Sequence, residues 1–477
     1  MDRRVNIRTL LQLLAFVYLI AFVSWGVQAQ GLIGSHGILP AADFLATVRR
    51  QLGSSAYRNC PTVFWLNSSD GALRAAWILG ALCSLAAIFA PVFAPVFTRG
   101  PLAQWKPIAQ RTAVTRAAFA GCLILWLSLC VVGQDFLSFQ WDVLLLEAGF
   151  LALFADDSPV RIWLFRWLIF RLMFYSGAVK LLSHDPNWHN LTALHYHYET
   201  QPLPTPLAWY MEQLPMWFQQ LSTAFTFFAE LIVPFLFFAP KPIRRVAAWI
   251  VLALQTLILL TGNYTFFNLL AIILTLFLFV EPRLAPTSAP MPVARGRVHR
   301  AVSVALVAFI GVVSGCVTLQ MFSVDLPGES AVLRAAEPLR IVNSYGLFAV
   351  MTTERPEIVV EGSNDGATWL AYEFPYKPGD LRRAPPIVAP HQPRLDWQMW
   401  FAALGNYQSN RWFVGFMLRL LQGEPSVQRL LRYNPFPNAP PKYIRARVYQ
   451  YHFTKFGEPG WWKREEHGLY FPAVSLK

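Results

Sequence analysis

Residues 302–321 read VSVALVAFIGVVSGCVTLQM, twenty consecutive positions without a charged side chain. A helix advances about 1.5 Å per residue and the hydrocarbon core of a bilayer is about 30 Å thick, so roughly 20 apolar residues cross it once. The stretch therefore predicts a transmembrane helix. The composition agrees, because 55% of the 477 residues are hydrophobic, only 14% are charged, and the mean hydropathy is +0.37. A membrane protein is expected rather than a soluble globule.

Eight further apolar windows precede this one, so the sequence predicts a polytopic α-helical membrane protein with about nine spans. The nine windows are 9–25, 72–97, 116–132, 139–154, 162–182, 218–238, 246–260, 266–280 and 302–321. The fourth window is short and carries Asp142 and Glu147, so a re-entrant segment is its alternative and would reverse the later topology. The first window is expected to be an uncleaved anchor, with cleavage near Ala29 as its alternative.

The basic residues of the loops predict the orientation, because Lys and Arg near helix ends are retained on the cytoplasmic side. With nine spans, the expected cytoplasmic segments contain Arg3, Arg4 and Arg8, then Arg99, Lys106 and Arg111, then Arg161, then Lys241, Arg244 and Arg245, and then Arg283, Arg295, Arg297 and Arg300. Loops around Asp135, Asp185 and Tyr264 are poor in basic residues. The N-terminus is therefore expected inside and the C-terminus outside. The net charge of +13 then favours contact with anionic lipid, and nucleic acid is not expected as a partner.

Composition changes after Met321, which divides the chain into a multi-span domain, 1–321, and a soluble, extracytoplasmic, β-rich domain, 322–477. Residues 358–360 indicate a strand, 362–366 a turn and 369–374 a returning strand. Residues 443–453 alternate between apolar and polar and indicate another strand. Apolar residues at helical spacing in 397–404 and 412–421 indicate two helices. We expect a β-sandwich-like domain that carries a helical insertion.

Neither a metal site nor a cofactor is expected. His195, His197 and Glu199 lie close together after the fifth span, but their spacing lacks a decisive third ligand, and an aromatic loop at the membrane interface is the favoured interpretation. Four of the five cysteines lie inside apolar windows, where a thiol usually behaves as a small hydrophobic group.

Ionisable residues inside the spans predict a buried polar network, because a charge at bilayer depth costs at least about 2.5–3.5 kcal/mol and normally finds a partner. Its expected members are Asp142, Glu147, Arg171, Lys180 and Glu230. Arg171 and Lys180 are nine residues apart and point to roughly opposite sides of one helix. Two interpretations remain open for Lys180, which is either a base or charge partner in a cavity, or a side chain that extends to the outer interface while Arg171 pairs with Glu147.

Several motifs resemble the lipase maturation factor family over nearly the whole chain. They are GQDF at 133–136, FQWDVLLLE at 139–147, TGNYTFFN at 261–268, IVNSYGLF at 341–348, VEGSNDG at 360–366, PRLDWQMW at 393–400 and YNPF at 433–436. The family positions to which we assign a role are Gln134, Asp135, Trp141, Asn263, Tyr264, Asn268, Asn343, Tyr345 and Trp397.

The resemblance implies a membrane-anchored maturation or folding factor that acts on a secreted lipase or another exported client protein through its outer domain. In animals the family is located in the endoplasmic reticulum membrane. The short N-terminus and the absence of an evident retrieval signal at the C-terminus favour a bacterial inner membrane with a periplasmic tail for this chain. Exposed aromatic residues such as Trp461 and Trp462 are expected to provide adhesive surface for a client.

A second, more remote resemblance concerns the membrane half. YSGAVKL at 175–181, followed by Asp185 and Trp188, is similar to the membrane region of vitamin K-dependent γ-carboxylases and related bacterial proteins. In that family a lysine in this motif is the catalytic base, which would correspond to Lys180. The alternative function is therefore a membrane enzyme that uses Lys180 on a lipid-soluble substrate, but a folding factor without enzymatic activity is favoured.

Overall fold

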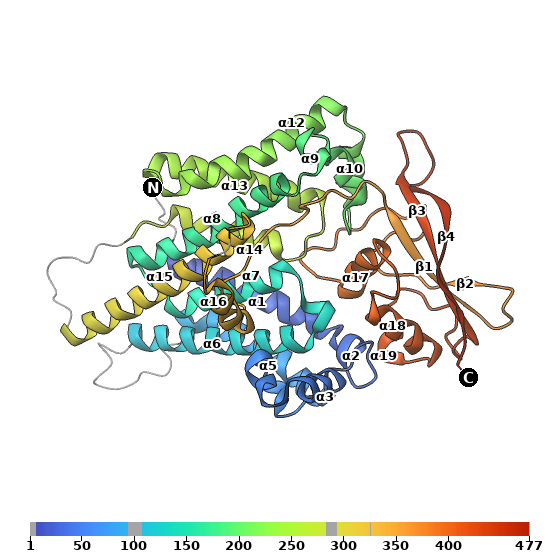
Figure 1. Cartoon of the computed structure of the whole chain (residues 1–477), viewed down its shortest axis with the longest axis horizontal. Helices are drawn as coiled ribbons and strands as arrows, with labels where there is room; N and C mark the ends of the chain where they lie inside the picture. The colour runs from blue at the N-terminus through green and yellow to red at the C-terminus, as the bar shows by residue number, and fades with distance from the viewer. Residues whose placement is uncertain (1–5, 94–106, 283–292, 325, 477) are drawn as a thin grey trace.

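The computed structural model describes residues 6–93, 107–282, 293–324 and 326–476. Helices from the first two thirds of the chain form a bundle, and the sheet and the helices after residue 393 lie at one end of it (Figure 1). The helices of the bundle are α1 (Ile7–Gly26), α2 (Ala29–Ile33), α3 (Ala41–Leu52), α4 (Ala56–Asn59), α5 (Asp70–Phe93), α6 (Pro107–Val132), α7 (Gln140–Phe154), α8 (Pro159–Leu182), α9 (Pro186–His189), α10 (Ala193–Thr200), α11 (Pro206–Glu212), α12 (Met216–Phe227), α13 (Lys241–Thr261), α14 (Phe267–Leu276) and α15 (Val293–Met321).

Seven helices are long and apolar enough to cross a membrane within the described residues. They are Ile7–Gly26, Asp70–Ala90, Thr112–Val132, Pro159–Leu182, Met216–Phe238, Lys241–Thr261 and Arg297–Met321. Each corresponds to one of the predicted windows, so the chain is a multi-pass membrane protein. The fourth and eighth windows form shorter helices, because α7 has 15 residues and α14 has 10, followed by a 3-10 turn to Phe279.

Both short helices reach from one end of the bundle to the other. Asp142, in the first turn of α7, contacts Arg394 of the tail, whereas Asp156, just after the end of α7, contacts His299 at the start of α15. Likewise, Tyr264, before α14, packs edge-on against Trp397 of the tail, and the carbonyl of Val280, beyond the C-terminal end of α14, accepts a hydrogen bond from Arg166. This arrangement favours nine crossings, although the number of spans stays a prediction.

Helix α8 lies at the centre of the bundle. Of its most apolar window, 72% is buried, compared with 28% for α15 at the periphery. It packs against α7, α14 and α15 and against the irregular segment that follows α12. That segment is a π-helical turn, Phe228–Ile232, continued by a 3-10 stretch, Val233–Phe238. Arg161, Arg171 and Lys180 of α8 are accordingly buried, whereas Arg166 is partly buried.

The tail contains a single four-stranded antiparallel sheet with the strand order β2-β1-β3-β4. Its elements are α16 (Glu329–Ala336), β1 (Pro356–Ser363), β2 (Leu370–Ala371), α17 (Arg394–Ala403), α18 (Arg411–Leu421), α19 (Pro425–Gln428), β3 (Tyr443–Phe453) and β4 (Trp462–Val474). The strands predicted around 358–360 and 443–453 and the two predicted helices are confirmed. The returning strand is shorter than expected.

The expected sandwich was wrong, because the described strands form one sheet rather than two. Helix α17 packs against β1 and α18 packs against β3, so helices supply the apolar layer that a second sheet would have provided. Strand β4 was not predicted because Lys463, Arg464, Glu465 and Glu466 give it little apolar alternation. It forms nonetheless by pairing along β3, from Trp462 opposite Phe453 to Val474 opposite Ile444.

Candidate functional site

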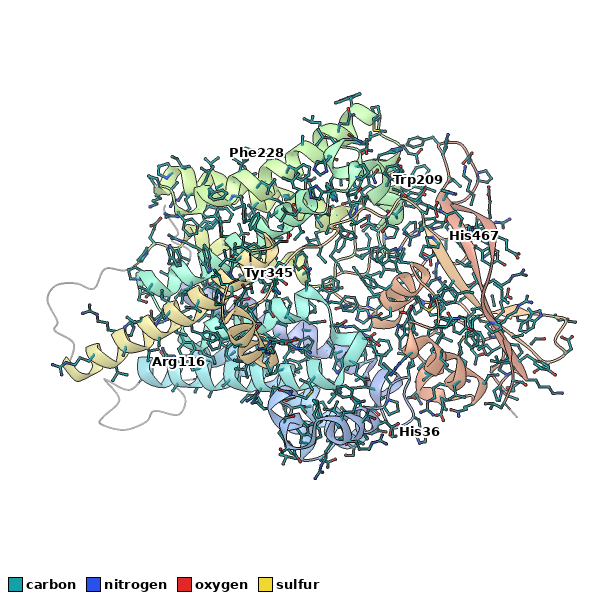
Figure 2. All side chains as sticks on the ribbon, in the orientation of Figure 1. His36, Arg116, Trp209, Phe228, Tyr345 and His467 are labelled. Carbon is teal, nitrogen blue, oxygen red and sulfur yellow. The ribbon has the colours of Figure 1, made fainter. Side chains whose placement is uncertain are left out.

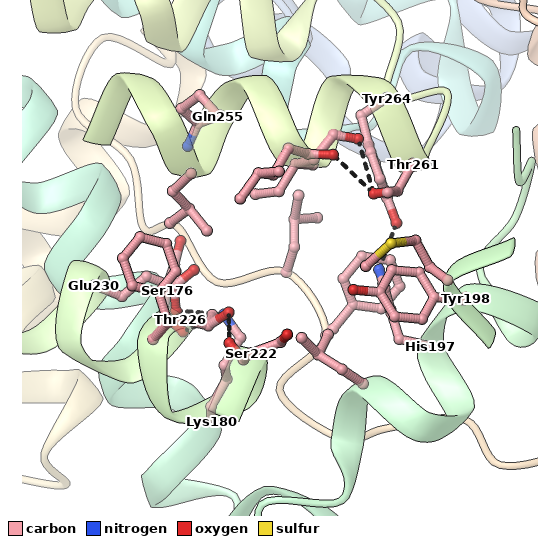
Figure 3. A pocket seen from close by; sticks show the side chains of 18 of the residues that line it. Ser176, Lys180, His197, Tyr198, Ser222, Thr226, Glu230, Gln255, Thr261 and Tyr264 are labelled. Carbon is pink, nitrogen blue, oxygen red and sulfur yellow. Dashed lines mark hydrogen bonds and ion pairs between the residues drawn. The ribbon is translucent and has the colours of Figure 1, made fainter. Parts of the chain in front are cut away.

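A cavity of about 490 Å³ lies between α8, the helices α10 to α13 and the tail (Figure 3). Most of its lining residues are aliphatic or aromatic, and Leu347 and Phe348 of the tail close part of it. Its polar side chains come from different elements. They are Ser176, Lys180, His197, Tyr198, Ser222, Thr226, Glu230, Gln255, Thr261 and Tyr264. Lys180 borders the cavity, as the first of its two interpretations expects, and the Arg171–Glu147 pair that belongs to the second interpretation is present as well.

Lys180 and Glu230 form an ion pair in the wall of this cavity. The Lys180 Nζ atom lies 2.7 Å from Glu230 Oε2 and donates a second hydrogen bond, of 3.0 Å, to the carbonyl of Ser176. It also lies 5.2 Å from the centre of the Trp188 ring. The two side chains are only 6% and 8% exposed, so each charge depends on the other for compensation.

The backbone brings these two groups together in two ways. Glu230 is the middle residue of the π-helical turn, and such turns often occur at functional sites because they re-aim a side chain. On the facing helix is Gly177, where a Cβ atom would come within 2.9 Å of Leu231 and of Glu230 itself. The close approach of α8 to the π-helical turn therefore needs glycine at this position.

The wall across the cavity from this ion pair is formed by His197, Tyr198 and Tyr264 (Figure 3). His197 Nε2 lies 3.1 Å from the Tyr264 hydroxyl, which itself donates a hydrogen bond of 3.0 Å to Gln201. His197 Nδ1 is buried without a hydrogen-bond partner among the described residues. Burial, with a contribution from the charge of Lys180, lowers the pKa of His197 to about 4, so its imidazole is neutral at physiological pH.

Glu147 and Arg171 form a second buried group, closer to the centre of the bundle. The two side chains are in direct contact and each is 1% exposed. The Tyr345 hydroxyl donates a hydrogen bond of 2.6 Å to Glu147, and Arg171 donates one of 3.2 Å to the carbonyl of Asn343. The tail therefore inserts the segment 341–348 among the helices, where Tyr345 is 1% exposed. Figure 2 shows the position of Tyr345 over the helical bundle.

Asp142 is bound by Arg394, a residue that the sequence analysis did not assign to the site. The guanidinium of Arg394 forms a bidentate salt bridge with the Asp142 carboxylate, with hydrogen bonds of 2.6 and 2.8 Å, and both side chains are fully buried. Arg394 is the second residue of the PRLDWQMW motif, and its place in a family motif could have pointed to a functional role. The predicted network is thus divided into three separate pairs, of which only Lys180–Glu230 borders the cavity.

Arg355 makes a third buried connection between tail and bundle. It is fully buried, pairs with Glu357 at 2.8 Å, and donates hydrogen bonds to the carbonyls of Glu199, Gln201 and Pro202. This role could not be predicted, because Arg355 lies in the polar run TTERPE, which is typical of an exposed loop.

Most of the remaining family positions also lie where the tail meets the bundle. Asn263 accepts hydrogen bonds from the backbone of Val388 and Ala389 and donates one to the carbonyl of Pro386. Trp141 bonds Gln392, and the carbonyl of Asp135 accepts from Gln398.

Two of the nine family positions make their contacts within the bundle, whereas Trp397 lies at the junction. Gln134 bonds the carbonyl of Leu39, and Asn268 bonds Gln255 inside the bundle. Trp397 packs edge-on against Trp141. Of the nine positions, Tyr264 alone lines the cavity. Most of the motif residues therefore hold the two halves of the molecule together.

The histidine-rich loop forms no cluster of three metal-ligating side chains within the described residues. His195 faces Glu212 at 3.7 Å, whereas His197 turns towards Tyr264 and Glu199 contacts His452 of β3. The helix α10 separates the two imidazoles because residues two apart lie on different faces of a helix.

The hypothesis of an adhesive surface at Trp461 and Trp462 was wrong for the second residue. Trp462 is 3% exposed, stacks against Phe453 and accepts the guanidinium of Arg355 on its ring. Trp461 is partly buried and packs against Trp209 of the bundle. Both aromatic residues serve the contact between the tail and the loop helices α10 and α11.

Comparison with known proteins identifies relatives for both halves of the chain. The family model for the lipase maturation factor transmembrane domain matches residues 5–285, and the model for the lipase maturation factor C-terminal domain matches residues 341–472. Lipase maturation factor 2 of Gallus gallus is 37% identical over 595 residues, which covers 97% of this chain and 80% of that protein. The Homo sapiens protein of the same name is 37% identical over 612 residues, covering 98% and 82%.

Lipase maturation factor 1 of Bos taurus is 33% identical over 520 residues, covering 98% of this chain and 88% of that protein. The comparison with solved structures gave no match. Both family models and full-length relatives above 30% identity agree, so the chain belongs to the lipase maturation factor family.

Proposed function

We propose that the protein is a membrane-embedded maturation factor that helps secreted lipases, or other exported client proteins, to reach their active fold. The observation that carries the proposal is the match of both halves to proteins named lipase maturation factor over nearly the whole chain. The buried junction between tail and bundle supports it, because a tail fixed on a membrane platform would hold a client beside the membrane that it has just crossed.

We further propose that the tail lies on the extracytoplasmic side. The loops predicted outside around Asp135, Asp185 and Tyr264 contact it. Asp185 accepts a hydrogen bond from the backbone of Met351, the carbonyl of Asp135 accepts one from Gln398, and Tyr264 packs edge-on against Trp397. Loops predicted inside contact one another at the opposite end of the bundle, as in the Arg244–Glu281 and His299–Asp156 pairs. A bacterial inner membrane with a periplasmic tail is the location that we propose.

Lipase secretion by a strain that lacks the gene tests this function. We expect a secreted lipase to be synthesised in normal amount, measured by immunoblot, but to lose most of its activity per molecule. The full chain should restore the activity, whereas the chain that ends at Met321 should not. A variant at an exposed position far from the junction, Leu66→Ala, serves as the matched control because Leu66 is 91% exposed. Unchanged specific activity in the deletion strain would reject the proposal.

An enzymatic function based on Lys180 has one observation in its favour, namely that this side chain borders a cavity. A lysine that acts as a base must offer its nitrogen lone pair to a substrate. Here the nitrogen serves as a donor, both to Glu230 and to the Ser176 carbonyl. A Lys180→Met/Glu230→Gln variant that folds and fully restores lipase activity would exclude the enzyme, and a folded but inactive one would support it.

A further inference from the structure

The walls of the Lys180–Glu230 cavity have the chemistry of a site for an acyl chain. Aliphatic and aromatic side chains of α11, α12 and α13 form them, among them Leu207, Phe218 and Leu254. Protein interiors are normally packed without voids, so an apolar space of about 490 Å³ is costly unless something fills it. Small-molecule pockets typically hold about 300–1,000 Å³. A volume in the lower part of that range suits one acyl chain better than the two chains of a phospholipid.

The cavity is bordered by residues that face the membrane. Leu221 of α12 is 61% exposed and Leu257 of α13 is 51% exposed, and both also line the cavity. The two helices belong to candidate spans, Met216–Phe238 and Lys241–Thr261. Surface that is exposed on a spanning helix is in contact with hydrocarbon. A ligand can therefore reach the cavity sideways from the bilayer, between α12 and α13.

The polar lining favours a head group without charge. Lys180 and Glu230 neutralise each other, so an anion placed beside them would leave a net buried charge. An unpaired buried ion costs on the order of several kcal/mol. His197 lies across the cavity, and Ser222 and Thr226 add hydroxyl groups. Hydroxyl and ester oxygens on a ligand can use such donors and acceptors, because each of these groups makes ordinary neutral hydrogen bonds.

We propose that this cavity binds a single-chain lipid with an uncharged, oxygen-bearing head group, such as a monoacylglycerol, which enters from the bilayer between α12 and α13. The acyl chain lies against the apolar walls, and the head group lies between the Lys180–Glu230 pair and His197. The proposal does not depend on the maturation function, since it concerns the membrane half alone and is read out by binding.

Photocrosslinking of the full-length protein in phospholipid nanodiscs tests the proposal. The probes are a monoacylglycerol and a fatty acid that carry the same diazirine in the acyl chain, and labelled peptides are mapped by mass spectrometry. Ile258→Trp fills the cavity from α13, and Leu260→Trp is its matched control, because Leu260 lies on the same helix, is 51% exposed and is not among the cavity-lining residues. Ser222→Trp fills the cavity from α12 and replaces Ile258→Trp if that variant does not fold.

We expect the monoacylglycerol to label peptides of α12 and α13, with labelling reduced at least about tenfold by the filling variant and unchanged by Leu260→Trp. Labelling by the monoacylglycerol should exceed labelling by the fatty acid, because Lys180 and Glu230 already neutralise each other and a carboxylate would add a net buried charge. Preferential labelling by the fatty acid, lost in the Lys180→Met/Glu230→Gln variant, would overturn the uncharged head group. Labelling that is absent, or equal in the filling and control variants, would overturn the site.

Discussion

At the scale of single residues, buried charges are held by partners distant in the sequence. Arg394 and Asp142 are 252 residues apart and fully buried. Replacing Arg394 by Met should lower the free energy of unfolding by about 3–5 kcal/mol, because it leaves the carboxylate buried and uncompensated. Denaturant unfolding in detergent micelles measures this, with Arg447→Met as the control. Arg447 and its partner Glu466 are partly exposed, so that loss should stay below about 1 kcal/mol.

The double variant Asp142→Asn/Arg394→Gln separates charge from packing. It removes both ions and keeps side chains of similar size that can bond each other, so it should recover most of the stability lost by Arg394→Met. If the double variant is as unstable as the single one, the uncompensated charge is not the cause.

His391 gives the stability a pH dependence of known sign. Burial, aided by repulsion from Arg394, lowers the pKa of His391 from 6.5 to about 4, and its Nδ1 lies 2.9 Å from the Ser24 hydroxyl. The unfolded chain takes up a proton near pH 6.5 and the folded chain near pH 4, so this contribution is complete above pH 6.5 and is lost as the pH falls towards 4. Partial exposure limits it to roughly 1–2 kcal/mol.

Comparison of the wild type with His391→Asn isolates this effect, because Asp396 acts in the opposite direction. Burial raises the pKa of Asp396 to about 6, so its contribution is complete at low pH and declines as the pH rises through that value. When the pH is lowered from about 7.5 to about 5, the melting temperature should fall further for the wild type than for the variant. An equal fall in both would show that His391 does not carry the effect.

Residue types in the spans predicted that charges would be buried, but not which groups would meet. A charge inside the bilayer is costly, so a partner was expected for each of Asp142, Glu147 and Lys180. The partner of Asp142 comes from the tail, and sequence distance carries no information about such a contact. Glu230 and Lys180 meet only because a π-helical turn re-aims one of them, which no apolar period reveals.

At the scale of elements, the meeting of α8 and the π-helical turn depends on Gly177. A methyl group there would lie 2.8 Å from Leu231, whereas one at Gly311 of α15 meets open space. Gly177→Ala should therefore cost about 1–3 kcal/mol of stability through overpacking. Gly311→Ala, the matched control, should be neutral or stabilising by up to about 1 kcal/mol, because alanine is the better helix former. Equal melting temperatures for the two variants would contradict this tight packing.

The long apolar helices could be predicted because the thickness of the bilayer sets their minimum length. The same argument could not predict the short lengths of α7 and α14 or the single sheet of the tail. Strand β4 forms because β3 offers it a long edge, although its own sequence alternates poorly. Helices α17 and α18 were predicted, but not that they would replace a second sheet, since the same apolar surface can be covered by either kind of element.

At the scale of the whole molecule, three buried arginines from different segments tie the tail to the bundle. Arg171 reaches the carbonyl of Asn343, Arg355 reaches carbonyls of the loop after α10, and Arg394 reaches α7. Hydrogen bonds from a guanidinium group are charge-assisted and stronger than neutral ones, and these are removed from water. The two family domains should therefore behave as one unit even when the chain connection between α15 and α16 is cut.

Cleavage of that connection tests this behaviour. A protease site inserted between Ser323 and Val324 should allow complete cleavage while both fragments elute together on size-exclusion chromatography in detergent. Adding Asp142→Asn and Glu147→Gln should release the tail fragment, because these two carboxylates accept hydrogen bonds from Arg394 and Tyr345 of the tail. Glu329→Gln, which alters a carboxylate that accepts a hydrogen bond from the backbone of Leu326 within the tail, is the control and should leave the fragments together. If the parent fragments separate after cleavage, the buried contacts are too weak to hold the tail, and the covalent link does so instead.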